Sequence, residues 1–263
     1  MFLRDDAVSF ISASVRTSHI QFRKAAMSMG NSYQDNLAAA ARLAHIAPLG
    51  SLREKVDPNH AALIVIDMQN DFCARGGLVD KGGRDVSAVQ DMAQHLPALI
   101  DSARKAGALV IFVRSVYTTD DNRYLSDVWL EQAARKQGGG YTQTPVCRDG
   151  SWEGDYYGDV RPLPGDIVVT KHRYNAFHKT DLDTILRANG VRTIVITGVS
   201  TNVCVESTVR EGFMNDYYVV LVRDGTAAYS NEEHEMTVHN IDRFFGEVST
   251  IDELRGIWCG RNA

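Results

Sequence analysis

The sequence has few cysteines, and no two of them are closely spaced. Four cysteines stand far apart among 263 residues, and none belongs to a CxxC pair: Cys73, Cys147, Cys204 and Cys259. This spacing argues against a zinc ribbon and against a small secreted domain held together by disulfides. A reducing cytosol fits this cysteine usage, so we expect a cytoplasmic protein.

Long apolar runs and blocks of like charge are also missing. No apolar stretch approaches the roughly 20 residues that a membrane-spanning helix needs. The net charge is −5, and the lysines and arginines are scattered along the chain. A basic footprint for nucleic acid or for an anionic membrane is therefore absent. We expect no nucleic-acid or membrane partner, and a small polar molecule as substrate.

The first part of the chain differs in composition from the rest. Residues 1–30 place arginine, serine and apolar residues in a loosely amphipathic order that is similar to a transit peptide, although two early aspartates oppose this reading. A plain appendage or an upstream start codon is the alternative. Residues 34–46 are rich in alanine and predict a helix. We expect residues 1–50 to be an extension with a disordered start followed by this helix, and 51–263 to be the main domain.

Short apolar runs alternate with segments of helical spacing from residue 61 onward. The predicted strands are 61–66, 108–113, 166–170, 193–197, 217–222 and 247–249. The predicted helices are 86–106, 124–136, 182–189, 203–214, 231–245 and 251–257, and an irregular surface loop is predicted at 138–163. Alternation of this kind requires right-handed crossovers between parallel strands. We therefore predict an α/β fold, a three-layer α/β/α sandwich with a doubly wound, mainly parallel six-stranded sheet.

Three polar residues stand at the ends of predicted strands. Asp67 follows the first strand, Lys171 the third, and Cys204 opens the helix after the fourth. In a doubly wound sheet, ligands bind outside the carboxyl ends of the strands. The dipole of a helix also favours the thiolate form of a cysteine at the helix N-terminus. Each residue has a structural alternative, as a helix cap, a surface lysine or a buried thiol, but all three together predict a reactive site.

Three stretches of the sequence carry a resemblance to a known family. They are Ile64–Phe72, Thr170–Lys171 and Ile196–Glu206. In this order they resemble the sequence motifs of the isochorismatase-like cysteine hydrolases, and the similarity runs from about Ala61 to Leu254. The resemblance implies that Asp67, Lys171 and Cys204 form the catalytic triad. It also implies a cis peptide bond between Val199 and Ser200.

Differences within that family narrow the expected chemistry. Members that hydrolyse isochorismate lack the nucleophilic cysteine, whereas this chain has Cys204. Nicotinamidases carry an aspartate and two histidines as metal ligands after the second strand, whereas residues 114–122 contain no histidine. We therefore expect neither a metal ion nor another cofactor.

The C-terminal half is most similar to the ureidoacrylate amidohydrolases of pyrimidine breakdown. The similarity is carried by residues 164–177, 201–213 and 240–249, but residues 113–117 depart from the Asn-x-Trp pattern of those enzymes. The resemblance implies an amidohydrolase that cleaves a C–N bond of a small ureido or carbamoyl compound. Biuret-type and N-carbamoyl amino acid amidohydrolases are the alternatives, and an inactive binding or assembly relative is a third. The family resemblance also implies a homo-oligomer, either a dimer or a tetramer.

The residue types suggest how such a reaction would run. Asp67 would accept the proton of Cys204, while Lys171 would stabilise the thiolate. Backbone N–H groups of Ser200 and Cys204 would hold the oxyanion of a covalent thioester or thiocarbamate pathway. Side chains near these positions are candidate substrate contacts, although plain packing is the alternative for the aromatic ones. These candidates are Gln69, Asn70, Phe72, Arg114, Tyr117, Arg173, Tyr174 and Phe177.

Overall fold

The computed structural model describes residues 30–44, 46–135 and 145–260, which divide into two compact units. The first unit ends at Glu54, four residues after the end of the predicted extension, and the second begins at Lys55. Helix α2 (Gly30–Ala44) belongs to the first unit and begins four residues before the predicted helix. The predicted disordered start lies at residues 1–29, outside the described residues.

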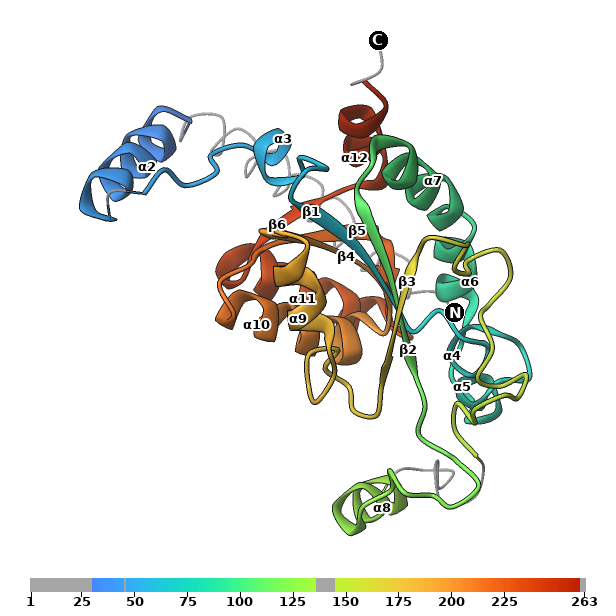
Figure 1. Cartoon of the computed structure of the whole chain (residues 1–263). Helices are drawn as coiled ribbons and strands as arrows, with labels where there is room; N and C mark the ends of the chain where they lie inside the picture. Colours follow the sequence, from blue (N-terminus) through green and yellow to red (C-terminus); the bar gives the residue numbers. More distant parts are fainter. Residues whose placement is uncertain (1–29, 45, 136–144, 261–263) are drawn as a thin grey trace, which may run out of the picture. The chain divides into compact units, whose positions relative to one another are not determined.

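The second unit alternates strands with helices (Figure 1). Its strands are β1 (Ala61–Ile66), β2 (Leu109–Ser115), β3 (Ile167–Lys171), β4 (Thr193–Val199), β5 (Tyr218–Ala227) and β6 (Glu247–Ser249). The short helix α3 (Leu52–Lys55) spans the boundary between the units. The helices that follow are α4 (Asn70–Cys73), α5 (Leu78–Lys81), α6 (Ser87–Ala93), α7 (Leu96–Ala106), α8 (Asp127–Ala134), α9 (Leu182–Ala188), α10 (Glu206–Met214), α11 (Asn231–Phe244) and α12 (Ile251–Cys259).

The six strands form one sheet in the order β3-β2-β1-β4-β5-β6, and every neighbouring pair is parallel. The chain builds outward from β1 to β3, then returns to β4 and builds in the other direction. This confirms the predicted doubly wound fold. The order reverses between β1 and β4, and this position is where such sheets bind ligands at their carboxyl edge.

Helices cover both faces of the sheet. Helices α6, α7 and α12 lie on one face, and α9, α10 and α11 lie on the other (Figure 1). All residues of β1 and β4 are buried, as expected for central strands covered on both sides. Within the described ranges, every helix is too short or too polar to span a bilayer.

The predicted helix at 86–106 is wrong as a single element, because it forms the two helices α6 and α7. Pro97 occupies the first turn of α7. A proline there lacks only an N–H that has no intrahelical partner, whereas inside a continuous helix its ring would collide with the preceding turn. The short helices α4 and α5 were not predicted, and α8 is shorter than predicted. From residue 145 to 163 the described chain is irregular, as expected, and residues 138–144 of the predicted loop lie outside the described residues.

Strand β5 is longer than predicted, because the polar pair Arg223-Asp224 interrupts the strand without ending it. The pairing with β4 shifts between Ile196 and Gly198, and it resumes with Thr226. A bulge places extra residues on one strand and lets the ladder continue beyond them. The carboxyl edge is therefore extended at β5.

A single turn of π-helix, η2 (Thr201–Val205), precedes α10 and contains Cys204. The sequence predicted a helix that begins at residue 203, next to this cysteine. The structure instead joins β4 to α10 through a wider turn, which begins directly after Ser200. The expected cis peptide bond between Val199 and Ser200 is present.

Gly198 allows β1 and β4 to approach closely at the edge that carries the site. Its φ is +105°, and a Cβ atom at this position would lie 2.0 Å from the carbonyl oxygen of Ile66. Glycine is the residue that tolerates both conditions.

We expect Gly198→Ala to lower the free energy of unfolding by about 3 kcal/mol or more, because backbone atoms must move apart. Gly256→Ala is the matched control, since an added Cβ atom on this exposed helical glycine would meet nothing within 4 Å. That control should raise stability by about 0.5–1 kcal/mol. Urea denaturation measures both, and a Gly198→Ala protein as stable as the wild type would contradict the close approach.

Candidate active site

The three strand-end residues meet at the carboxyl edge of the sheet. The Nζ atom of Lys171 lies 2.7 Å from Oδ2 of Asp67 and 3.6 Å from Sγ of Cys204. Asp67 and Lys171 are fully buried, and Cys204 is 7% exposed. An ammonium group therefore contacts both a carboxylate and a thiol at one point.

The backbone at Asp67 turns sharply where β1 ends. Its φ is +53°, a left-handed conformation that aspartate tolerates better than most residues. The N–H of Asp67 still donates to the carbonyl of Val113, while its own carbonyl accepts from the N–H of Gln69. This turn directs the carboxylate across the strand ends instead of along β1.

Burial and charge set the protonation states of the buried triad. Burial raises the pKa of the Cys204 thiol far above its usual range, and the Asp67 carboxylate adds to this rise, although the Lys171 ammonium opposes it. Burial alone would lower the pKa of Lys171, but the neighbouring negative charges outweigh it and hold this pKa above its ordinary value. These directions favour an ammonium and a neutral thiol in the resting site. This differs from the expectation that a helix N-terminus would favour the thiolate.

The backbone around the thiol is the π-helical turn η2. The N–H groups of Val203 and Val205 both donate to the carbonyl of Ser200, at 3.1 and 3.2 Å. The N–H of Cys204 lies between these two along the chain. Ser200 itself is 9% exposed. Both residues of the expected oxyanion hole thus lie at the π-helical turn, Ser200 directly before it and Cys204 within it.

Gln69 connects three segments behind the triad. Its Oε1 accepts from the N–H of Ser115 at 2.7 Å, and its Nε2 donates to the carbonyls of Ser115 and Gly154 at 3.0 and 2.8 Å. Asn70 donates to the carbonyl of Trp152. Both amides fix the exit of β1 to the irregular loop around residues 152–156.

The two arginine candidates already have partners. Arg114 forms an ion pair with Asp149 at 2.8 Å. Arg173 donates to the backbone carbonyls of Tyr124 and His172, and its guanidinium lies 5.0 Å from the ring centre of Trp129. Arg173 therefore belongs to the aromatic group beside the triad, whereas Arg114 is held by the loop.

An aromatic group lies beside Lys171. The ring of Tyr117 stacks on that of Trp129 at 5.5 Å, Tyr174 lies 4.8 Å from the same indole, and Lys171 Nζ lies 6.0 Å from the Tyr117 ring. Phe72 packs against the buried cluster that contains Tyr117. Tyr117, Trp129 and Tyr174 thus form one contacting group next to Lys171, and Phe72 packs against the same cluster.

Phe177 has a different environment from the other aromatic candidates. Its ring packs against Tyr217 at 5.9 Å and lies in the core cluster that includes Ile194 and Val209. A Cβ atom at Gly212 would contact its ring. Phe177 therefore packs between β4 and α10.

Sequence reasoning missed two residues beside the triad. Ser115 ends β2 and contacts both charged residues of the triad, but the predicted strand stopped at Val113. The available signal was only that Ser115 lies two residues beyond the predicted end of that strand. Trp129 lies in α8, beyond the carboxyl end of β2 (Figure 1), and no local pattern pointed to it.

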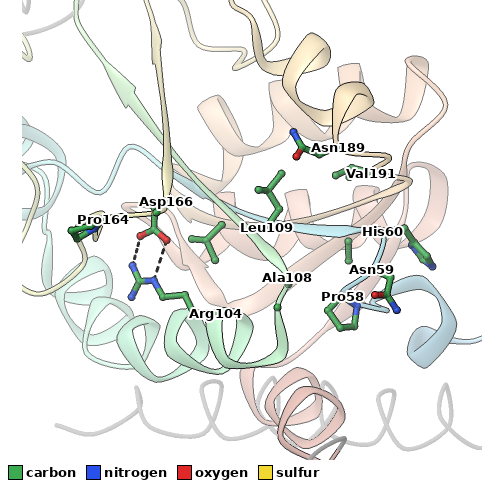
Figure 2. Close-up of a pocket in the computed structure, with 14 residues that line it drawn as sticks. Pro58, Asn59, His60, Arg104, Ala108, Leu109, Pro164, Asp166, Asn189 and Val191 are labelled. Atoms are coloured by element: carbon green, nitrogen blue, oxygen red, sulfur yellow. Dashed lines mark hydrogen bonds and ion pairs between the residues drawn. The ribbon is translucent and has the colours of Figure 1, made fainter.

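The larger of two described cavities lies at the opposite edge of the sheet. Its volume is about 570 Å³, and the amino-terminal ends of β1 and β2 contribute to its lining. Figure 2 shows that Arg104 and Asp166 in its wall are paired with each other. The other cavity, of about 410 Å³, contains His234, whose Nδ1 lies 2.9 Å from Oγ1 of Thr201 in η2. In the parts of the chain that the structure describes, no group of three or more acidic, histidine or cysteine side chains is placed to hold a metal ion.

A doubly wound parallel sheet with a buried carboxylate, ammonium and thiol at its switch point defines a class of α/β proteins with a potential cysteine nucleophile. The family model of the isochorismatase domain matches residues 61–253. This chain belongs to the isochorismatase family.

Curated relatives and solved structures agree with this assignment. The ureidoacrylate amidohydrolase RutB of Variovorax paradoxus is 37% identical over 204 residues, which cover 74% of this chain and 79% of that protein. A cysteine hydrolase from Pseudomonas syringae pv. phaseolicola has a TM-score of 0.67 at 28% identity, covering 78% of this chain and 95% of the other. The N-carbamoylsarcosine amidase of Thermoplasma acidophilum has a TM-score of 0.57 at 26% identity, covering 73% and 97%.

We expect Lys171→Met to lower the free energy of unfolding by about 3–5 kcal/mol, because it leaves the Asp67 carboxylate buried without its counter-charge. Lys55→Met is the matched control, since Lys55 forms an ion pair of the same 2.7 Å length with the partly exposed Glu247. That pair should contribute only about 0–1 kcal/mol. Equal losses for the two variants in urea denaturation would argue against a strongly buried pair.

We expect Cys204 to be a neutral thiol in the resting protein at about pH 7, because its pKa is raised by burial. The ultraviolet difference spectrum between the wild type and Cys204→Ala should then show no thiolate band near neutral pH. A thiolate band that depends on Cys204 and appears below neutral pH would overturn this assignment of protonation states.

Proposed function

We propose that this protein is a cysteine-dependent amidohydrolase that cleaves a C–N bond of a small ureido or carbamoyl compound, with ureidoacrylate as the first candidate. The observation that carries this proposal is the contact of the Lys171 ammonium with both Asp67 and Cys204. A thiol, a proton acceptor and a fixed positive charge at one point are the components of nucleophilic catalysis by cysteine.

In the first half of the reaction, Sγ of Cys204 bonds to the substrate carbonyl carbon while the thiol proton passes to Asp67. Lys171 stabilises the negative charge on sulfur as it forms. Backbone N–H groups of Ser200 and Cys204 receive the oxyanion of the tetrahedral intermediate. The C–N bond then breaks, and the proton on Asp67 passes to the departing nitrogen. A thioester or thiocarbamate remains on Cys204.

In the second half, water attacks the carbonyl carbon of this covalent intermediate. Asp67 accepts a proton from the water and returns it to the sulfur as the C–S bond breaks. The acid or carbamate product leaves, and the neutral thiol is restored. The two halves therefore use the same carboxylate as base and as acid.

The comparisons support a ureido or carbamoyl substrate over other amides. Several curated relatives at 33–38% identity are named ureidoacrylate amidohydrolases, and a solved neighbour is an N-carbamoylsarcosine amidase. Because of the N-carbamoylsarcosine amidase, N-carbamoyl amino acids stay an alternative substrate class. Biuret-type compounds are another alternative. Residues 113–117 depart from the Asn-x-Trp pattern expected of ureidoacrylate amidohydrolases. The contacts of the substrate with Gln69, Asn70, Phe72, Arg114, Tyr117, Arg173, Tyr174 and Phe177 stay part of the proposal.

The wider expectations about the protein also stay proposals. We propose that the protein acts without a metal ion or another cofactor. We also propose that it works in the cytoplasm, because all four cysteines are free thiols. We propose a homo-oligomer, a dimer or a tetramer, on the strength of the family resemblance. An inactive binding or assembly relative is the remaining alternative, and the close contact of the three reactive groups argues against it.

We expect ammonia release from at least one of ureidoacrylate, biuret, N-carbamoyl amino acids and nicotinamide, with ureidoacrylate the fastest. Cys204→Ala should lose activity by about a thousandfold or more, because no other group supplies the nucleophile. Mass spectrometry of a stopped reaction should find the acyl or carbamoyl adduct on the peptide that contains Cys204. Turnover of none of these compounds, or full activity of Cys204→Ala, would refute the proposed enzyme.

A further inference from the structure

Ser115 lies between the two charged residues of the triad. Its side chain is fully buried, and Oγ lies 2.9 Å from Oδ1 of Asp67 and 2.7 Å from Nζ of Lys171. The register of β2 and β3 pairs Ser115 with Lys171, which places both side chains on the same face of the sheet. One hydroxyl group therefore connects the acid and the amine.

The donors and acceptors fix the direction of these hydrogen bonds. The Lys171 ammonium has three N–H groups, and they donate to Oγ of Ser115, the carbonyl of Arg173 and Sγ of Cys204. Since Oγ of Ser115 accepts from the ammonium, its own hydrogen is directed to Oδ1 of Asp67. The order of donation is thus Lys171 to Ser115 to Asp67.

This order makes the two carboxylate oxygens of Asp67 different. Oδ1 accepts the hydrogen of Ser115. Oδ2 lies 2.7 Å from the Lys171 ammonium and accepts nothing from Ser115, while the Asp67 carboxylate also hydrogen-bonds the thiol of Cys204. Oδ2 therefore keeps a lone pair for a further proton.

We propose that Ser115 is a positioning residue that makes Oδ2 of Asp67 the acceptor for the thiol proton of Cys204. The inference rests on the proposed function, because it concerns the proton transfer that activates the nucleophile. Gln69 holds Ser115 from behind by accepting from its N–H and donating to its carbonyl. The hydroxyl is thus fixed by the backbone and does not depend on substrate for its orientation.

The test uses alkylation of Cys204 by iodoacetamide, which needs no knowledge of the substrate. Sγ bonds to the methylene carbon, iodide leaves and the thiol proton passes to Asp67. Peptide mass spectrometry follows Cys204 separately from the other three cysteines. The titratable groups that face Ser115 are Asp67, Lys171, Cys204 and Tyr117, so the rate is measured across a pH series.

We expect Ser115→Ala to slow the alkylation of Cys204 by about tenfold or more. The pH profile of the rate should also differ from that of the wild type, because Ser115 hydrogen-bonds both charged residues of the triad. Ser115→Thr retains the hydroxyl and should recover most of the rate. Ser102→Ala removes another buried hydroxyl, which donates to the carbonyl of Ala98 away from the triad, and should change neither rate nor profile.

Turnover provides the second measurement. With whichever amide the wild type hydrolyses, Ser115→Ala should lower kcat by a similar factor and leave KM within about twofold, because the hydroxyl contacts the triad and not the substrate. Slow alkylation with a changed pH profile supports the positioning role even if no amide is hydrolysed, in which case only the proposed function fails. Wild-type alkylation with an unshifted profile overturns the role of Ser115, whatever the activity.

A second variant keeps the test decisive if Ser115→Ala does not fold. Ser115→Cys fills the same space with a group that is a weak donor and a weak acceptor. Slow alkylation of Cys204 in this folded variant supports the proposal. A wild-type rate in it overturns the proposal.

Discussion

The ion pair between Asp67 and Lys171 is the constraint around which the carboxyl edge of the sheet is built. Two charges withdrawn from water are costly unless they are paired and hydrogen-bonded. The pair meets this condition because Ser115 and the carbonyl of Arg173 satisfy the ammonium, while Ser115 also donates to the carboxylate. The parallel arrangement of β1, β2 and β3 makes these contacts possible, because the carboxyl ends of the three strands lie side by side at one edge of the sheet.

The same pair sets the reactivity of Cys204. A lone thiol at this depth would be inert, because burial opposes the thiolate. The ammonium offsets part of that opposition, and the carboxylate is present to receive the proton. In the proposed mechanism, the negative charge forms on sulfur as the proton moves, inside a site that is already balanced in charge. A buried neutral thiol could serve as the proposed nucleophile in this way.

The elements that the sequence predicted best are those whose environment is uniform along their length. Strand β1 is buried at every residue, so its apolar run marked it from end to end. The errors fall where a distant contact overrides the local pattern. Strand β5 continues beyond Arg223 because Thr226 pairs with Gly198, and Ser115 became part of the site only through its register with Lys171. Neither pairing leaves a local trace in the sequence.

The sequence by itself determined the class of fold and three of the residues at its reactive edge, because hydrophobic periodicity and strand-end positions are local properties. The tertiary structure alone decided how these groups interact. Distances among Asp67, Ser115, Lys171 and Cys204 depend on strand register and on the turns that follow each strand. The protonation state of Cys204 depends on burial by segments far away in the chain. Such quantities arise only when distant parts of the chain share one desolvated volume, where charges interact strongly over short distances.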